Sequence, residues 1–311
     1  MDLYLILFTI AFFITMLVTP FIARLAFFVG AVDRPNGRKI HDTFMPRLGG
    51  LAIFLGFFTA MLVLVTKKPI FTGLLVGGTI VLILGMIDDI RGVSPRVKLL
   101  WQTMAALVVV YFCFDMDTLS NFLHGLFRLG ILAVPLTVFW IVAVTNAVNL
   151  IDGLDGLASG VSAIALLTFA FIAYRGGQES AALVSVILVG AILGFIRYNF
   201  FPAKIFLGDS GSLFLGFMVA VLSAYGIVQG TTLYAFIIPI IVLGVPIVDT
   251  CYAIVRRFYE KQPIFQPDKK HIHHRLLKRG YTQIQAVLLI YAISVCLSIS
   301  ALLIMYGVSS F

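Results

Sequence analysis

The chain has few charged residues. Only 12% of its 311 residues are Asp, Glu, Lys or Arg, whereas 61% are hydrophobic. An ordinary soluble domain carries about 25% charged residues, and a soluble protein of this length cannot hide so much apolar surface from water. The composition therefore excludes a soluble globular protein, and we predict an integral membrane protein whose apolar side chains face lipid.

Cysteine is also scarce. The chain has three cysteines, Cys113, Cys251 and Cys296, and none has a spacing typical of a disulfide framework or a zinc motif. We expect them to be buried structural residues. A basic leader and a small-residue cleavage site are missing at the start, where Met1-Asp2 runs directly into apolar sequence. We therefore expect a first membrane span that is retained.

A concentrated basic patch is the third missing feature. The formal net charge is +8, but the basic residues are scattered between apolar runs. This pattern argues against nucleic-acid binding. It favours basic loops that face an anionic lipid leaflet, or a site for phosphates.

Long apolar runs are abundant. A membrane helix needs about 20 residues, and lipid cannot satisfy open backbone groups, so spanning segments must be helical. We predict ten spans, at about 3–23, 48–65, 70–87, 97–114, 131–148, 157–174, 181–198, 212–228, 233–255 and 284–306. The ninth is interrupted by Pro239 and Pro246. The predicted fold is all-α, with residues 1–311 forming one polytopic membrane domain.

The distribution of lysine and arginine predicts the orientation, because cytoplasmic loops are enriched in both. One side holds all of these residues except Lys67, Lys68, Arg128 and Arg175. We assign that side to the cytoplasm, with both termini exterior. The predicted cytoplasmic loops are about 24–47, 88–97, 149–157, 199–211 and 256–283.

Four polar motifs lie at this predicted cytoplasmic face, and the first is the adjacent pair Asp88 and Asp89. Neighbouring carboxylates repel, so a cation or a basic partner is expected nearby. Oxygen ligands suit Mg²⁺, which typically takes one or two carboxylates and leaves positions for phosphates and water. The alternative is a solvated helix end.

The second motif lies between two apolar runs and has polar residues every three positions: Asn146, Asn149, Asp152 and Asp155. On an α-helix this spacing drifts by roughly 60° per step, so the four side chains need not share one face. We expect the Asn pair to end one helix and the Asp pair to line a loop loosened by Gly153 and Gly156. The carboxylates could accept hydrogen bonds from a sugar or a base, or Asp155 could cap the next helix.

The third motif includes Lys204, Phe206, Gly208 and Asp209 and precedes an apolar helix. Glycine permits close approach to a phosphate, a helix N-terminus favours anions, and Asp209 could hold a metal. The alternative is a helix cap formed by Asp209 or Ser210.

The fourth motif is His271-Ile272-His273-His274-Arg275. Its side chains suit phosphate oxygens; a zinc site and a solvated basic loop are the alternatives. Asp249, inside the ninth span, either pairs with Arg256 or supports the site.

Taken in order, these motifs and Pro46-Arg47-Leu48-Gly49-Gly50 resemble the polyprenyl-phosphate N-acetylhexosamine-1-phosphate transferases over nearly the whole chain. The His-Ile-His-His form favours the bacterial branch that transfers N-acetylglucosamine 1-phosphate from UDP-N-acetylglucosamine to undecaprenyl phosphate. The product initiates teichoic-acid linkage units, O-antigen or enterobacterial common antigen. The alternative within the family is a phospho-N-acetylmuramoyl-pentapeptide transferase, or another UDP-N-acetylhexosamine donor.

The resemblance implies roles for individual residues. Asp209 and Asp88 would hold Mg²⁺, with Mn²⁺ as an alternative, and Asp88 would also be the candidate base or nucleophile. The further catalytic candidates are Asp89, Asp152 and His274. The candidates for substrate binding are Asn146, Asn149, Asp155, Phe206, Lys98, Arg47, His271, His273 and Arg275, and Lys39 is a second candidate for the first-loop cation.

The resemblance also implies a location in the bacterial cytoplasmic membrane and leaves room for a homodimer. An ion-coupled transporter is the competing class of protein. A transporter needs acids near the middle of the bilayer, whereas here the acids cluster at one face.

Overall fold

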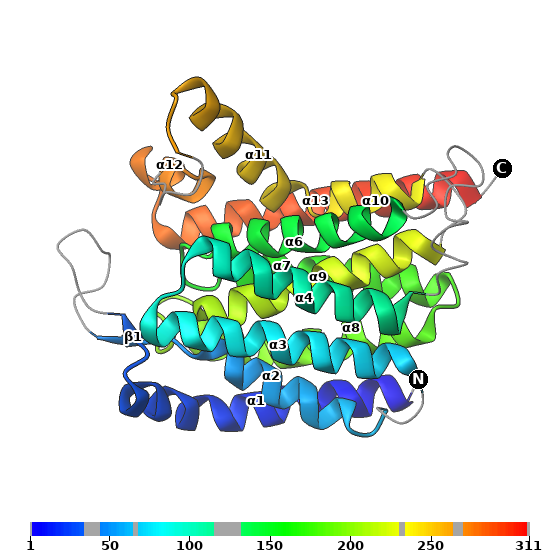
Figure 1. The fold of residues 1–311 in the computed structure, drawn as a ribbon, viewed down its shortest axis with the longest axis horizontal. Helices are drawn as coiled ribbons and strands as arrows, with labels where there is room; N and C mark the ends of the chain where they lie inside the picture. The colour runs from blue at the N-terminus through cyan, green and yellow to red at the C-terminus, as the bar shows by residue number, and fades with distance from the viewer. Residues whose placement is uncertain are drawn as a thin grey trace.

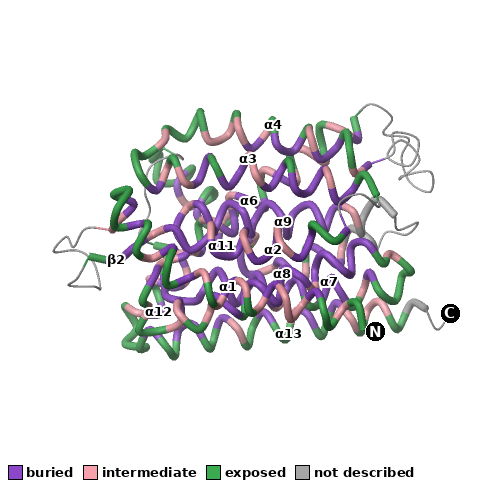
Figure 2. Tube along the Cα trace, turned by 90° about the horizontal axis from the view of Figure 1, so that it is seen from below, coloured by how far each residue is buried: buried purple, intermediate pink, exposed green. Residues whose placement is uncertain are grey.

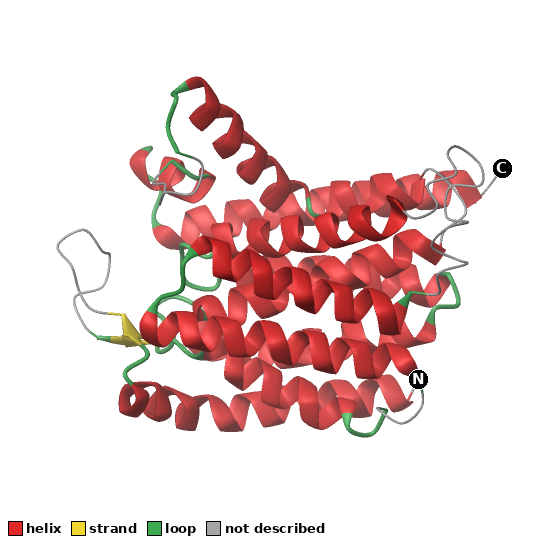
Figure 3. Cartoon of the chain, viewed as in Figure 1, coloured by secondary structure: helices red, strands yellow, loops and turns green. Residues whose placement is uncertain are grey.

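The computed structural model describes residues 2–33, 44–64, 68–114, 132–229, 234–263 and 270–309, and these form a helical bundle (Figure 3). Its helices are α1 (Asp2–Val29), α2 (Gly49–Met61), α3 (Pro69–Arg91), α4 (Pro95–Cys113), α6 (Ala133–Ile151), α7 (Leu157–Arg175), α8 (Glu179–Asn199), α9 (Gly208–Gln229), α10 (Tyr234–Val242), α11 (Gly244–Tyr259), α12 (Ile272–Lys278) and α13 (Gln283–Ser309). The strands β1 (Val32–Asp33) and β2 (Met45–Pro46) pair antiparallel.

The long helices run side by side, and the loops that carry the motifs gather at one end (Figure 1). The strand pair and α12 lie at that end, and we call it the motif end. The start of α1 and the last turns of α13 lie at the opposite end. Eight helices among the described residues are long and apolar enough to span a membrane: α1, α3, α4, α6, α7, α8, α9 and α13.

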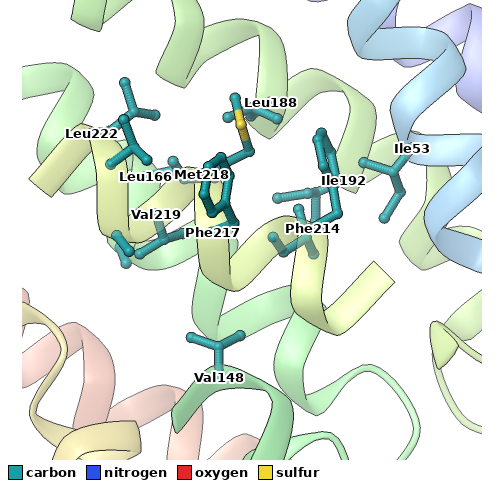
Figure 4. Packing of buried hydrophobic residues seen from close by; sticks show 14 of the residues in the cluster. Ile53, Val148, Leu166, Leu188, Ile192, Phe214, Phe217, Met218, Val219 and Leu222 are labelled. Carbon is teal, nitrogen blue, oxygen red and sulfur yellow. The ribbon is translucent and has the colours of Figure 1, made fainter. Parts of the chain in front are cut away.

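The central helix is α9, which packs against α6, α3, α2 and α7. Buried residues gather on inner helices such as α9 and α8, whereas α4 and α13 expose much of their length (Figure 2). Phe214, Phe217 and Met218 of α9 fill the interior beside Ile192 of α8 and Ile53 of α2 (Figure 4). In lipid the exposed apolar faces need no cover, so the packing of helix on helix must stabilise this core.

Small residues allow the closest helix contacts. A Cβ atom added at Gly190 or Gly194 of α8 would overlap backbone atoms of α1 at Phe8 and Phe12. The two glycines are four residues apart and therefore share one face of α8, the spacing that lets membrane helices approach closely.

The predicted all-α membrane fold is confirmed in its class. The number and limits of the spans differ from the sequence-based prediction in two places: α2 is a shorter apolar helix, and the predicted ninth span is two helices that meet at Leu243. The second of these, α11, projects away from the bundle (Figure 1). Pro239 lies inside α10 and Pro246 in the first turn of α11, where a missing N–H costs nothing.

Candidate functional site

The start of α9 is held in place by Asp89. This buried side chain on α3 accepts hydrogen bonds from the backbone N–H groups of Asp209 and Ser210, both at 2.9 Å. The first N–H groups of a helix have no partner inside the helix, so Asp89 supplies the cap. Gly208 has φ +73°, and a Cβ atom there would lie 2.6 Å from Asp89 Oδ2. Glycine is therefore required for both its conformation and its size.

A second anchor comes from Pro46-Arg47-Leu48-Gly49-Gly50. The backbone N–H groups of Gly49 and Gly50 donate to the carbonyl oxygens of Phe206 and Leu207 at 3.1 Å, and Phe206 N–H donates to Pro46 O at 2.8 Å. These bonds join the first motif loop to the segment before α9. The backbone of this motif therefore helps to position the start of α9.

The polar side chains of α3, α4 and α6 meet at Asp209. Asn149 donates to Asp209 Oδ1 at 2.6 Å and to Ser212 Oγ at 2.8 Å. The Lys98 ammonium lies 3.5 Å from Asp209 Oδ2 and also contacts Asp88 Oδ2. The other oxygen of Asp88 accepts from Val93 N–H at 2.6 Å. The cluster thus brings together Asp88, Lys98, Asn149 and Asp209 from four helices.

Two further charged side chains border this cluster. Arg47 lies 3.4 Å from Asp33 and 3.9 Å from Asp89. Asp152 follows α6 directly, and burial together with the negative charge of Asp209 raises the pKa of the Asp152 carboxyl to about 8. Lys98 and Arg47 thus lie beside four carboxylates, those of Asp33, Asp88, Asp89 and Asp209. A further cation beside them would stabilise the ionised carboxylates.

Carboxylate oxygens, the donors in this cluster, are ligands that Mg²⁺ accepts in proteins. Within the described ranges, no group of three or more His, Cys, Asp or Glu side chains is placed to hold a metal ion. Magnesium typically binds one or two protein carboxylates and completes its shell with water and phosphates. Asp209 and Asp88, which both reach the Lys98 ammonium, could supply those two carboxylates.

Three of the predicted substrate contacts have partners inside the fold. The Asn146 amide donates to Gln102 Oε1 at 2.6 Å and to a backbone carbonyl of its own helix at 2.7 Å. The Asp155 carboxylate accepts from Ala203 N–H at 3.0 Å. The backbone of Phe206 is bonded to the first motif loop. These side chains shape the loops around the cluster, and their roles in substrate binding stay predictions.

The histidine motif forms the start of α12 beside the loop that follows α6. His273 is buried, and a Cβ atom at Gly153 would overlap its imidazole. Burial lowers the pKa of His273 to about 3, and His274 and His271 add to the effect, so this ring is neutral near pH 7. His274 lies 4.3 Å from His273 between ring centroids. Arg275 stacks on Tyr252 of α11 at 5.1 Å.

Some contacts were not predicted from the sequence. Asp249 bonds to His271, not to Arg256. Asn199 is buried and links Ser159 to the carbonyl of Ile205, which holds the loop before α9. Asp249 and Asn199 each stand out in the sequence as a polar residue within an apolar run, but the sequence does not reveal the partner of either side chain. Lys39, the second candidate for the first-loop cation, lies outside the described residues.

The acidic groups gather at the motif end of the bundle instead of halfway along the spans. Asp88 and Asp89 lie in the last turn of α3, Asp209 in the first turn of α9, and Asp152 just beyond α6. A transporter with a path of acids through the bilayer requires a different placement.

Comparison with known proteins identifies relatives of this chain. Residues 71–227 match glycosyl transferase family 4. The chain is 47% identical over 299 residues to the probable undecaprenyl-phosphate N-acetylglucosaminyl 1-phosphate transferase of Bacillus subtilis (strain 168), covering 96% of this chain and 84% of the relative.

Two further relatives are more distant. The decaprenyl-phosphate N-acetylglucosaminephosphotransferase of Mycobacterium tuberculosis (strain ATCC 25618 / H37Rv) is 37% identical, covering 89% of this chain and 76% of the relative. The phospho-N-acetylmuramoyl-pentapeptide-transferase of Clostridium botulinum (strain Eklund 17B / Type B) is 33% identical, covering 90% and 88%.

The apolar helices and the bacterial relatives agree that the chain is a multi-pass protein of the bacterial plasma membrane. The resemblance inferred from the motifs is confirmed by a family match over half of the chain and by these relatives. The chain belongs to glycosyl transferase family 4.

Proposed function

We propose that this protein transfers N-acetylglucosamine 1-phosphate from UDP-N-acetylglucosamine to undecaprenyl phosphate. The products are UMP and the lipid-linked sugar that initiates a cell-envelope glycopolymer. The observation that carries this proposal is the 47% identity, over 96% of the chain, to a relative whose name states this activity. The pentapeptide transferase of Clostridium botulinum supports the second candidate donor, at the lower identity of 33%.

The proposed reaction brings an anionic lipid phosphate to an anionic nucleotide diphosphate. We infer that Asp209 and Asp88 hold Mg²⁺, with Mn²⁺ as an alternative, because two carboxylates there reach one ammonium group. When bound, the ion would neutralise phosphate charge and polarise the phosphate oxygens. Without such an ion, the ionised carboxylates of the cluster would repel both substrates.

The residues of the chain position these groups. Asn149 holds the Asp209 carboxylate by a bond of 2.6 Å, and Asp89 fixes the backbone that carries it. Lys98 supplies a positive charge between Asp88 and Asp209 that a phosphate oxygen could share. His273 is neutral, so it would contact an anion by hydrogen bonding and not by charge, and its buried Nδ1 has no hydrogen-bond partner among the described residues.

The chemical step we propose is direct. An oxygen of the lipid phosphate attacks the β-phosphorus of the UDP-sugar, and the bond from that phosphorus to the UMP oxygen breaks. A phosphate monoester has a second pKa of about 6, so the acceptor needs little help from a base near neutral pH. Asp88 would orient the acceptor or take its remaining proton.

The alternative step is a covalent aspartyl-phosphate intermediate at Asp88. Incubating the enzyme with UDP-N-acetylglucosamine and labelled UMP, without lipid, separates the two routes. Direct attack predicts no label in the UDP-sugar. Robust exchange would instead establish the covalent route.

We place the motif end in the cytoplasm, with both termini exterior. Arg91 ends α3 there, and Arg96 and Lys98 lie in the first turn of α4, in agreement with the enrichment of basic residues on the cytoplasmic side. A homodimer is a further expectation, and the mass of the protein in detergent tests it.

The proposal is tested by UMP release. Purified protein is given undecaprenyl phosphate, Mg²⁺ and a panel of donors: UDP-N-acetylglucosamine, UDP-N-acetylgalactosamine and UDP-N-acetylmuramoyl-pentapeptide. We expect fastest release with UDP-N-acetylglucosamine. Faster release with the muramoyl donor would replace the proposed donor, and no lipid-dependent release with any donor would overturn the activity.

A further inference from the structure

Asp249 is a buried carboxylate of α11 that the proposed mechanism does not use. Both of its oxygens contact the start of α12, 22 residues further along the chain. Oδ2 lies 2.7 Å from His271 Nδ1, and Oδ1 accepts from Ile272 N–H at 2.8 Å. Both side chains of the pair are almost fully buried, with relative exposures of 5% and 6%.

The chemistry of this pair fixes the His271 ring. An ionised carboxylate can only accept hydrogen bonds, so the proton at their contact belongs to His271 Nδ1. In the neutral ring, Nε2 is then an acceptor that points away from Asp249. A carboxylate that binds one imidazole nitrogen in this way sets which role the other nitrogen can play.

His273 lies between the His271 ring and the loop that carries Asp152. His271 and His273 are parallel within 7°, with centroids 6.0 Å apart. His273 packs against Gly153, the residue after Asp152. The orientation imposed by Asp249 on α11 is therefore passed through two rings to the loop that carries Asp152.

The other contacts between α11 and the α12 segment are more exposed. Glu260 and Lys270 form an ion pair at 2.9 Å, with side chains 34% and 52% exposed. Exposed ion pairs of this kind contribute little to structure. Among the described contacts of α11 with the histidine motif, the buried one is made by Asp249.

We propose that Asp249 is a positioning residue for the transfer reaction: it fixes the tautomer and orientation of His271 and the first turn of α12, and thereby holds the histidine motif against the Asp152 loop. This inference rests on the proposed function, because the motif matters only if the substrates bind beside it. Asp249 itself contacts no reacting group.

Asp249→Asn tests the proposal most sharply. The amide keeps an oxygen for Ile272 N–H but places an NH₂ group opposite Nδ1, which forces His271 into the other tautomer. We expect kcat for UMP release to fall about 10- to 100-fold, as when the carboxylate partner of a metal-bound histidine is removed. Glu260→Gln is the matched control, because it removes a carboxylate that joins the same two segments, and it should leave kcat unchanged. Equal losses in both variants would contradict the proposal.

A double variant shows whether Asp249 acts through His271. His271→Asn keeps an N–H near the position of Nδ1 and removes Nε2. We expect Asp249→Asn to reduce kcat no further in this background. If Asp249→Asn lowered kcat as much in this background as in the wild type, Asp249 would not act through His271.

Nitrogen-15 NMR of histidine-labelled protein gives a readout that does not depend on activity. The His271 signals, assigned by their loss in His271→Asn, should show a protonated Nδ1 in the wild type and an unprotonated Nδ1 in Asp249→Asn. An unprotonated wild-type Nδ1 would overturn the proposal even if the variant fails to fold. If wild-type protein shows this signature but releases no UMP, the proposed function fails and the positioning geometry stands.

Discussion

The carboxylate cluster and the histidine motif lie at the same end of the molecule but are supported differently. The cluster is built on α3, α4, α6 and α9, and the start of α9 is fixed by hydrogen bonds to the Asp89 side chain and by backbone hydrogen bonds to the loop at residues 46–50. The histidine motif is carried by a short helix that contacts the projecting α11 through a few side chains. The bundle therefore holds the charged groups rigidly. The histidine motif depends on a few side-chain contacts, each of which a single substitution can remove. Substitutions in the cluster should therefore lower kcat more than substitutions in the histidine motif.

The largest effect is expected for Asp209→Asn. The amide keeps the bond to Asn149 but loses the charge at the point where Asp88 and Lys98 converge. We expect kcat to fall by about 10³-fold or more, because groups that stabilise charge in a transition state contribute on this scale. UMP release measures the loss, and an unchanged thermal unfolding midpoint would show that the bundle is intact. Near-normal turnover would refute the metal assignment.

The next effect tests the rigid support of the cluster. Gly208→Ala introduces a left-handed alanine, which costs about 1–3 kcal/mol, and drives its Cβ into Asp89. Gly30→Ala is the matched control, because Gly30 also has a positive φ, +79°, but has nothing within 4 Å of a Cβ. Unfolding midpoints and kcat should both fall more in Gly208→Ala. Equal effects would mean that the contact with Asp89 is unimportant.

The histidine motif should be less sensitive than the cluster. We expect His274→Ala to reduce kcat about 10²-fold, the lower range for a group that assists proton transfer or hydrogen-bonds in the transition state. Stability should change little because His274 is only partly buried. An unaffected rate would mean that this segment is a solvated basic loop.

The smallest effect concerns the contact between the two regions. Gly153→Ala places a methyl group where the His273 ring lies, so α12 must move away. We expect about a tenfold loss of kcat, because small displacements of positioned groups slow catalysis while α12 can adjust. Gly307→Ala, with open space around its Cβ, is the control. A loss as large as that of Asp209→Asn would show that the histidine motif is as rigidly required as the cluster.

The distribution of lysine and arginine predicted that the motifs with Asp88, Asn149 and Asp209 share one membrane face, whereas Lys98 was named only from the family resemblance. The sequence did not predict that Asp89 caps α9, because a residue pattern does not reveal which donors a buried carboxylate will find. The break at Leu243 was visible as two prolines, but the direction of α11 was not. That direction brings Asp249 to His271, a contact that depends on the folded arrangement of segments 22 residues apart.

The central claim is that the cluster at the start of α9 performs metal-assisted transfer of a sugar phosphate. The most direct test is UMP release from UDP-N-acetylglucosamine and undecaprenyl phosphate, measured over a range of Mg²⁺ concentrations for the wild type and Asp209→Asn. The account predicts release by the wild type that rises with Mg²⁺ and disappears with a chelator, and almost none by the variant at any concentration. Release that is independent of Mg²⁺, or equal in the two proteins, would contradict it.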